Sequence, residues 1–291
     1  MAIRQITIIG TGLIGGSFGL ALKKHRFRGR IVGCDREPVL KRAQKLGVID
    51  EGESNPLKAV GGSQVILLAT PVGAIIELIE RLSPTLSPQT LLTDVGSTKA
   101  EVLSRAKKIF GTSTRTRFLA GHPMAGKEHS GVEFADPDLF RGAAWLVTPL
   151  PGQNVQEGLS GEFLKWVKKI GARIATIDAD EHDQLCAWIS HLPQLISTAL
   201  AALLVDEYGN KPMLEVGGRA LGEVTRISGS PYSMWRDIAL TNKKNIQQTL
   251  LKLEQRLAHL RENLDTRELA MEFDRAHRLR DISKTEKKNG I

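Results

Sequence analysis

Apolar and polar positions in the first part of the chain follow two alternating rhythms. Short apolar runs rich in β-branched residues recur at residues 6–10, 30–35, 65–70, 91–95, 117–122, 144–149 and 172–178. Between them lie segments with helical spacing, such as residues 37–47, 72–82 and 99–110. Strands that alternate with helices predict a mainly parallel sheet covered on both faces. Right-handed crossovers make a Rossmann-type, doubly wound α/β fold the simplest topology.

The rhythm changes after residue 178. Residues 186–208 have helical spacing and are apolar nearly all round, which predicts a buried helix with a kink at Pro193. Further on, one apolar stripe marks a long amphipathic helix that packs either on its own domain or against another subunit; it consists of Ile246, Leu250, Leu253, Leu257, Leu260 and Leu264. We therefore expect a Rossmann domain at residues 1–178 and an all-α domain at residues 179–291.

Composition narrows the class of protein. The 291 residues are 41% hydrophobic and 25% charged, as in ordinary soluble enzymes, and there is no run of eighteen apolar residues, so no membrane span is expected. The N-terminus lacks a signal-peptide pattern, and two distant cysteines, Cys34 and Cys186, suit a reducing cytoplasm. We predict no metal site and no nucleic-acid partner, and interpret the net charge of +8 as favouring small anionic ligands.

A glycine pattern follows the first predicted strand. Residues 10–15 read GTGLIG, a GxGxxG that ends a strand and opens a helix, with Leu13 and Ile14 between the glycines. Gly10 permits a tight turn, Gly12 lets the backbone approach a pyrophosphate, and Gly15 lets the helix pack on the strand. The unpaired N–H groups of the helix start would then face the phosphates. This pattern predicts a dinucleotide site.

The residues after the second and third strands bear on the choice of cofactor. Asp35 ends the second strand, where a carboxylate accepts hydrogen bonds from a ribose diol and repels a 2′-phosphate. Arg36 could bind that phosphate, so NAD is favoured and NADP stays as the alternative. Thr70 and Pro71 form a strand-to-helix turn on the nicotinamide side.

Two further strand ends carry candidate chemistry. In the first, DVGSTK, the capping-box spacing of Thr98 and Glu101 explains a helix start but leaves Ser97 and Lys99 unexplained at a sheet edge where ligands bind. The second, AGHPMAGKEHSG, holds His122 between a glycine and a proline that fix the local backbone. Neutral imidazole is the usual base for a hydroxyl proton, so His122 is the candidate base.

These segments together resemble one family, the prephenate and arogenate dehydrogenases of tyrosine biosynthesis. The resemblance runs along nearly the whole chain and rests on GTGLIGGS, DVGSTK, GHPMAG with KEHSG, SHLP and TRISGSPYSMWRDI in that order. It implies oxidative decarboxylation of prephenate to 4-hydroxyphenylpyruvate with reduction of NAD. It also implies a homodimer formed through the helical domain, which would bind substrate as well.

The resemblance also implies roles for single residues. His122 matches the histidine that takes the proton of the ring hydroxyl, and Ser97 matches a serine beside that hydroxyl and the nicotinamide. His191 matches a substrate-binding histidine, and Arg226 matches the arginine that holds a substrate carboxylate, a task suited to a planar, charged fork. Two further residues match positions near the pocket, Glu128 at its edge and Trp235 close to the active site and subunit interface.

The chain departs from family patterns at three positions. Lys127 stands where many relatives have threonine, Gln194 where prephenate-preferring members often have a second histidine, and Glu223 where some have aspartate. Prephenate is the first choice of substrate, and arogenate, or use of both, is the alternative. Without the resemblance, His191 would be a buried structural histidine. The rival functions are another β-hydroxyacid-type dehydrogenase and a redox sensor that binds dinucleotide without turnover.

Overall fold

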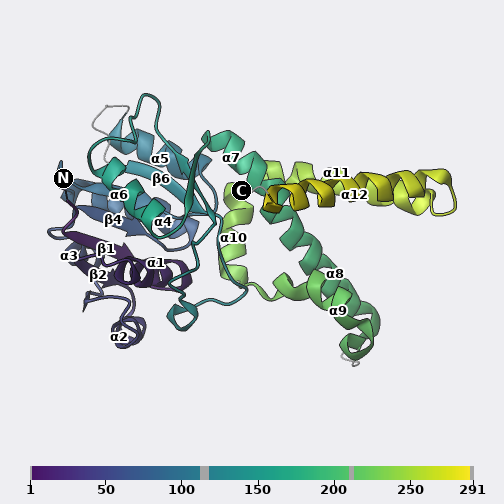
Figure 1. The fold of residues 1–291 in the computed structure, drawn as a ribbon, viewed down its shortest axis with the longest axis horizontal. Helices are drawn as coiled ribbons and strands as arrows, with labels where there is room; N and C mark the ends of the chain where they lie inside the picture. Colours follow the sequence, from purple (N-terminus) through teal and green to yellow (C-terminus); the bar gives the residue numbers. More distant parts are fainter. Residues whose placement is uncertain (1, 112–117, 210–212, 289–291) are drawn as a thin grey trace. The chain divides into compact units, whose positions relative to one another are not determined.

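The computed structural model describes residues 2–111, 118–209 and 213–288. Its first part is built on an eight-stranded sheet with the strand order β3-β2-β1-β4-β5-β6-β7-β8 (Figure 1). The strands are β1 (Gln5–Ile9), β2 (Arg30–Cys34), β3 (Glu51–Gly52), β4 (Val65–Leu68), β5 (Leu91–Asp94), β6 (Phe118–Pro123), β7 (Ala144–Thr148) and β8 (Arg173–Thr176). β6 and β7 are antiparallel, and all other neighbouring strands are parallel. The prediction of a mainly parallel, doubly wound sheet is confirmed.

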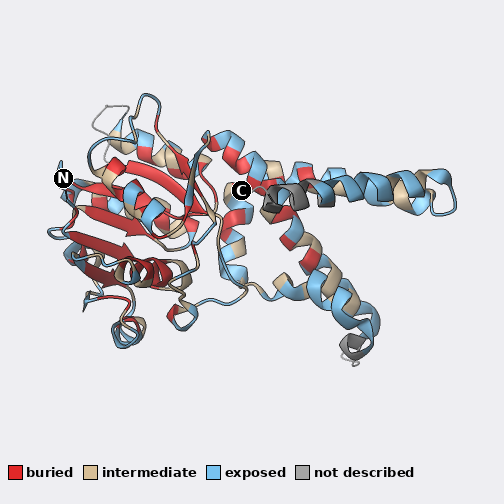
Figure 2. Cartoon of the chain, viewed as in Figure 1, coloured by how far each residue is buried: buried red, intermediate tan, exposed pale blue. Residues whose placement is uncertain are grey.

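Each predicted apolar run contains one strand, although Arg117, at the start of one run, lies outside the described residues. The sequence pattern missed β3, because this edge strand has only 2 residues and no apolar run. The central strands are buried along their whole length, and they appear as red arrows in Figure 2. Burial on both faces explains why they read as continuous apolar runs rather than as alternating ones.

Helices cover both faces of the sheet. One apolar cluster joins the sheet to α1 (Leu13–Lys24), α2 (Glu37–Lys45) and α6 (Gly158–Lys169). A second cluster joins the opposite face to α3 (Pro56–Ala59), α4 (Val72–Leu82) and α5 (Ala100–Phe110). The chain therefore leaves β1 toward one face and returns to β4 from the other. The carboxyl ends of β1 and β4 flank the point where the strand order reverses, which is where such sheets bind ligands.

A long helical run follows the sheet. It consists of α7 (Ala179–Cys186), a π-helical turn (Ala187–His191) and α8 (Leu192–Tyr208). The π-helical turn ends two residues before Pro193, and the predicted kink at Pro193 stays a prediction. Pro193 has no N–H to donate to the carbonyl four residues earlier, so the hydrogen-bond pattern changes just before it. The prediction of a buried helix is wrong for the single chain, because only Leu192, Gln194 and Ser197 of α8 are buried.

The run Ala179–Tyr208 is long and apolar enough to cross a membrane by length and composition. Core helices of soluble proteins pass the same test. The side chains that this run buries include His182, Asp183, His191 and Gln194, which hydrogen-bond to other parts of the protein. These contacts fit a helix that packs on protein.

The remaining described elements are helical. They are α9 (Met213–Thr225), a 3-10 turn (Arg226–Gly229), α10 (Tyr232–Thr241), α11 (Lys243–Glu262) and α12 (Arg267–Lys288). No strand occurs among the described residues after β8, so the prediction of an all-α second part is confirmed. The chain forms two compact units, Met1–Lys243 and Lys244–Ile291. The predicted boundary at residue 178 stays a prediction.

Along α11 the predicted apolar stripe is only partly covered. Ile246 is buried, whereas Leu257 is 54% exposed and Leu264, just beyond the helix, is 65% exposed. Arg256 of α11 pairs with Glu272 of α12 at 2.7 Å, so the two helices contact each other through charged side chains as well. The stripe is therefore buried at its start and leaves part of its apolar surface open further along.

Candidate functional site

The turn between β1 and α1 has the geometry of a phosphate cradle. Gly10 has φ +92°, and a Cβ there would collide with the carbonyl of Ala69 on the neighbouring β4 turn. Gly15 packs against the carbonyl of Gly10, whereas a Cβ on Gly12 would meet no atom within 4 Å. Gly12 therefore faces open space, which a phosphate group bound by the backbone N–H groups of this turn could occupy. Leu13 and Ile14, which follow Gly12 directly, form the first turn of α1.

Asp35 ties the glycine turn to the end of β2. Its Oδ2 accepts hydrogen bonds from Thr11 N at 2.8 Å and Thr11 Oγ1 at 3.2 Å, and its Oδ1 accepts one from Arg36 N at 2.8 Å. Asp35 remains partly exposed, and a carboxylate has about four acceptor positions, so it can also accept from a ribose hydroxyl.

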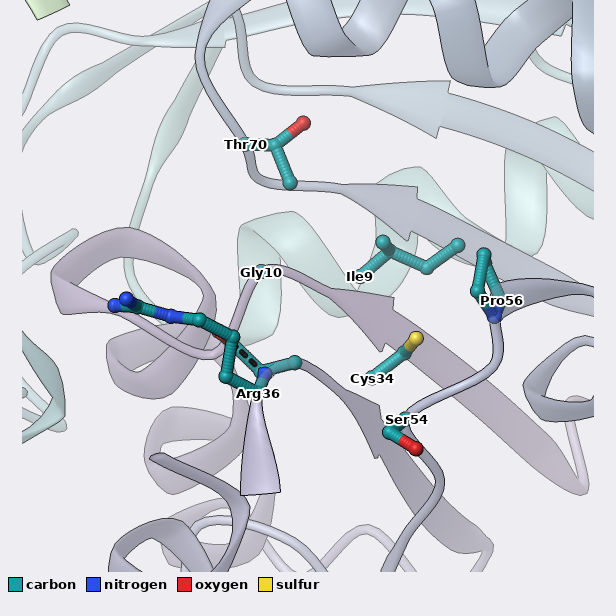
Figure 3. Close-up of a pocket in the computed structure, with 8 residues that line it drawn as sticks. Ile9, Gly10, Cys34, Arg36, Ser54, Pro56 and Thr70 are labelled. Carbon is teal, nitrogen blue, oxygen red and sulfur yellow. Dashed lines mark hydrogen bonds between the residues drawn. The ribbon is translucent and has the colours of Figure 1, made fainter. Parts of the chain in front are cut away.

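A pocket opens at these strand ends (Figure 3). It is lined by Ile9, Gly10, Cys34, Asp35, Arg36, Ser54, Pro56 and Thr70. Burial is the main reason why the pKa of the Cys34 thiol is raised to about 11, so Cys34 adds no charge to the pocket. Thr70 Oγ1 is buried and has no hydrogen-bond partner among the described residues, and Pro71 next to it caps the N-terminus of α4. The open face at Gly12, the carboxylate and this orphaned hydroxyl fit a dinucleotide.

The turn after β5 is held by a buried ion pair. Asp94 and Lys99 are fully buried and bonded to each other through Oδ2 and Nζ. Asp94 also accepts hydrogen bonds from Gly96 N at 2.8 Å and from Gly121 N at 3.2 Å. The pair thus joins the DVGSTK turn, which includes half-buried Ser97, to the strand that carries His122.

The capping box proposed for α5 is not formed. Thr98 Oγ1 bonds instead to Thr241 Oγ1 at 2.8 Å, and Lys99 is the N-cap residue. The N–H groups of Lys99 and Ala100 are satisfied by Asp183 of α7, at 2.7 and 2.9 Å. Spacing along the chain could not show that a distant carboxylate caps this helix.

His122 lies near the end of β6, opposite Leu146 of β7, and is 9% exposed. Its Nδ1 is 2.9 Å from Nε2 of His182. Burial, followed by the charges of His182, Lys99 and His191, lowers the pKa of His122 well below its usual value. The imidazole is therefore neutral at physiological pH, as a proton acceptor must be.

His182 and Asp183 belong to this site, and sequence reasoning did not identify them. Nδ1 of His182 is 2.8 Å from Oδ1 of Asp183, and Cys186 Sγ lies 3.6 Å from His182 Nε2. The one available signal was a histidine and an aspartate side by side in the polar first turns of the helical run, just before its apolar part. A metal could be considered, because ligand atoms of His122, His182 and Cys186 lie within 4.8 Å of one another. The 2.9 Å between the two imidazole nitrogens is instead a hydrogen-bond distance.

His191 is buried on the π-helical turn and contacts Trp235 edge-on, with ring centroids 5.8 Å apart. Asn242 Nδ2 lies 3.2 Å from its Nδ1 and also donates to the carbonyl of Asp183 at 2.7 Å. An amide nitrogen only donates, so Nδ1 of His191 accepts and Nε2 carries the proton. Burial lowers the pKa of His191 to about 4. Its Nε2 and Nε1 of Trp235 are buried without a hydrogen-bond partner among the described residues.

Arg226 begins the 3-10 turn and pairs with Glu128, with 3.1 Å between Nη1 and Oε2. The pKa of Glu128 is lowered, first by a hydrogen bond from the backbone N–H of Glu128 to its own carboxylate and then by the charge of Arg226. Both side chains are open to solvent, at 58% and 35% exposure, so a carboxylate ligand can reach the guanidinium.

Two of the unusual positions have structural roles. Gln194 donates to the carbonyl of Ile227 at 2.8 Å and accepts from Ser230 Oγ at 3.1 Å, which holds the turn that carries Arg226. Lys127 bonds to Asp136 at 3.0 Å, within the loop after β6. His129 in this loop is exposed and stacks on Phe134. Glu223 is exposed on α9.

Comparisons with known proteins bear on the family of the chain. Residues 18–176 match the family profile "Prephenate dehydrogenase, nucleotide-binding domain", and residues 178–277 match "Prephenate dehydrogenase, dimerization domain". The chain is 33% identical over 267 residues to a prephenate dehydrogenase of Lactococcus lactis, which covers 87% of this chain and 72% of that protein. It is 35% identical over 246 residues to a prephenate dehydrogenase of Bacillus subtilis, with 83% and 65% covered.

A solved structure gives the same result. Prephenate dehydrogenase from Aquifex aeolicus, determined in complex with hydroxyphenyl propionate and NAD+, superimposes with a TM-score of 0.83 at 30% identity. The alignment covers 98% of this chain and 99% of that one. Family profiles that together span most of the chain, and relatives above 30% identity, lead to one conclusion. The chain belongs to the prephenate dehydrogenase family of oxidoreductases.

Proposed function

We propose that the chain catalyses the NAD-dependent oxidative decarboxylation of prephenate to 4-hydroxyphenylpyruvate, a cytoplasmic step of tyrosine biosynthesis. The observation that carries this proposal is a buried, neutral His122 at the end of β6, joined through Asp94 to the DVGSTK turn. A nucleotide site lies on the same carboxyl edge of the sheet. This combination suits removal of a hydroxyl proton as hydride leaves the same carbon.

The proposed chemistry divides between the two histidines. His122 accepts the proton of the ring hydroxyl, and Ser97, in the turn joined to the same strand, orients that hydroxyl. His191 offers a buried N–H at Nε2, which suits a hydrogen bond to a substrate oxygen. Both rings stay neutral because burial lowers their pKa values, so one can accept and the other donate.

Charge recognition falls to the exposed pair at the 3-10 turn. Arg226 would hold a substrate carboxylate in a bidentate contact, and this carboxylate would replace that of Glu128 as the partner of the guanidinium. Glu128 would lie at the edge of the site, and Trp235 would support His191, whose ring it contacts edge-on. The net charge of +8 favours approach of a dianion.

The nucleotide site fits NAD. Gly10, Gly12 and Gly15 would hold the pyrophosphate with Leu13 and Ile14, Asp35 would accept from the ribose, and Thr70 and Pro71 would border the nicotinamide. When bound, NAD supplies the hydride acceptor. Thr11 holds Asp35 beside the pocket, and a carboxylate there would repel the 2′-phosphate of NADP. Arg36 lines the same pocket, so NADP remains the alternative.

The second part of the proposal is a homodimer formed by the helical segment. Large apolar side chains of α8 and α10 are more than half exposed in the single chain, among them Leu203, Val205, Tyr208, Tyr232 and Leu240. Exposed apolar side chains that form a contiguous patch often mark a protein interface. The matched dimerization profile supports a second copy as the partner.

Four parallel assays test the proposed activity. The absorbance at 340 nm is followed with prephenate or arogenate, each with NAD or NADP. We expect the largest kcat/KM with prephenate and NAD. Preference for arogenate would change the proposed substrate, and preference for NADP would change the proposed cofactor. No turnover in any assay would refute the proposed activity and leave the two rival functions, another β-hydroxyacid-type dehydrogenase and a dinucleotide sensor.

A further inference from the structure

Three side chains form a continuous hydrogen-bonded row behind the proposed base. Asp183 Oδ1 lies 2.8 Å from Nδ1 of His182, and Nε2 of His182 lies 2.9 Å from Nδ1 of His122. All three residues are buried, with exposures of 2%, 0% and 9%. Two members, Asp183 and His182, come from α7 and the third comes from β6, so the row joins the helical segment to the sheet.

The direction of each hydrogen bond follows from the first member. The carboxylate of Asp183 accepts from the backbone N–H groups of Lys99 and Ala100, at 2.7 and 2.9 Å. An ionised carboxylate only accepts, so the proton between it and His182 sits on Nδ1 of His182. In a neutral ring, Nε2 of His182 is then the acceptor. The donor to it must be Nδ1–H of His122, which leaves Nε2 of His122 without a proton.

Two other arrangements of these atoms fit less well. A metal shared by both histidines would place its two nitrogen ligands about 3.3 Å apart, since tetrahedral zinc binds nitrogen at about 2.0 Å. The observed 2.9 Å is shorter. A doubly protonated His182 would donate to both neighbours and would force the proton of neutral His122 onto Nε2, where no hydroxyl proton could be accepted. Cys186, the thiol beside both rings, has its pKa raised to about 12 by burial and so adds no charge.

We propose that His182, held by Asp183, is a positioning residue that fixes His122 in the tautomer whose Nε2 accepts the substrate proton. The tautomer follows from the hydrogen bonds alone, whereas its effect on catalysis rests on the proposed function. Without an acceptor at Nδ1, His122 is free to carry its proton on Nε2, where it blocks the reaction. A similar loss of the correct tautomer, when the orienting group of a catalytic histidine is changed, greatly lowers turnover in serine proteases.

Two substitutions of His182 separate tautomer control from packing. In His182→Gln the side-chain carbonyl can take the place of Nε2 and accept from His122, whereas His182→Leu fills the space without an acceptor. We expect His182→Leu to lower kcat about 100-fold with KM values within about threefold, and His182→Gln to keep kcat within about fivefold. Cys186→Ala removes the Sγ atom that lies beside His182 but outside the row, and it should leave kcat within about twofold of the unmodified value. Equal losses in the Gln and Leu variants would overturn the proposal.

A measurement of the proton itself does not depend on turnover. Nitrogen-15 NMR of histidine-labelled protein near pH 7.5 distinguishes protonated from unprotonated ring nitrogens, and His122 is assigned from the missing signals of His122→Asn. We expect a protonated Nδ1 and a bare Nε2 in the unmodified protein and in His182→Gln, and a shift toward protonated Nε2 in His182→Leu. A protonated Nε2 in the unmodified protein would overturn the tautomer, even where the proposed activity holds. The expected tautomer in a protein that oxidises neither substrate would refute only the proposed function.

Discussion

His122 and His191 are connected through one buried group of side chains, yet they present opposite ring nitrogens. The row from Asp183 assigns the proton of His122 to Nδ1, and the amide of Asn242 assigns that of His191 to Nε2. One ring can therefore accept a proton while the other donates a hydrogen bond, although both are neutral histidines in similar surroundings. Neighbouring donors and acceptors decide the role of each ring.

Burial of His122 makes a prediction for the dependence of activity on pH. Its pKa in the folded protein is lowered, mainly by burial, so the ring stays neutral as the pH falls below the ordinary value of 6.5. We expect kcat/KM for prephenate to hold its plateau down to pH 6 and to fall only at lower pH. A profile of initial rates from pH 5 to 9 checks this. An acidic limb centred at or above pH 6.5 would contradict a neutral, buried base.

Arg226 is predicted to act on binding. Arg226→Ala removes a charge-assisted contact to the substrate, a loss of about 1.5–3 kcal/mol, and should raise KM for prephenate about 10- to 100-fold. Arg226→Lys keeps the charge without the planar fork, so its KM for prephenate should lie between those of the unmodified protein and Arg226→Ala. Steady-state kinetics with saturating NAD give the answer. An unchanged KM in Arg226→Ala would remove this residue from the site.

Among helices and strands, the sequence predicted those whose signal is local. Apolar runs marked the strands that lie buried between two helix layers, and the glycine pattern marked the β1–α1 turn. It missed β3, which has no apolar run, and it assigned the start of α5 to Thr98 when a carboxylate on α7 caps it. His182, Asp183 and Asn242 were missed for the same reason. Their partners are set by tertiary contacts, which no spacing along the chain encodes.

The buried pair of Asp94 and Lys99 is predicted to fix the ends of β5 and β6. Lys99→Met leaves the carboxylate of Asp94 buried without its counter-ion, so the free energy of unfolding should fall by about 3–5 kcal/mol. Lys23→Met breaks the partly exposed pair with Asp50 and serves as the matched control, with an expected loss under about 1 kcal/mol. Urea unfolding, followed by fluorescence, gives the free energy of unfolding of both variants and of the unmodified protein. Equal losses of unfolding free energy in the two variants would show that the buried Asp94–Lys99 pair stabilises the protein no more than a surface pair.

For the whole protein, the helical segment is the part least explained by a single chain. Its apolar side chains led to the prediction of a buried helix, yet α8 buries only three residues and leaves Leu203 at 56% exposure. The sequence pattern therefore predicted that this helix is buried, but it could not show which surface covers it. A second copy of the chain supplies such a surface in the proposed dimer.

The dimer is tested by placing a charge on that surface. We expect sedimentation equilibrium to give about twice the 31.9 kDa mass of one chain for the unmodified protein. Leu203→Arg should shift the mass toward the monomer, because an arginine buried at an apolar interface loses its hydration. Leu46→Arg, at an exposed site after α2, is the control and should remain dimeric. A monomeric unmodified protein, or a Leu203→Arg variant as dimeric as the control, would contradict the assignment.

The assignment of His122 as the base is decided by one comparison, turnover and cofactor binding in His122→Asn. Asparagine keeps a polar side chain near the row but cannot accept the hydroxyl proton. We predict that kcat for prephenate falls by about 10²–10⁴-fold, the usual contribution of a general base, while the Kd for NAD changes less than about threefold. Unimpaired turnover in this variant, with NAD bound normally, would show that another group takes the proton.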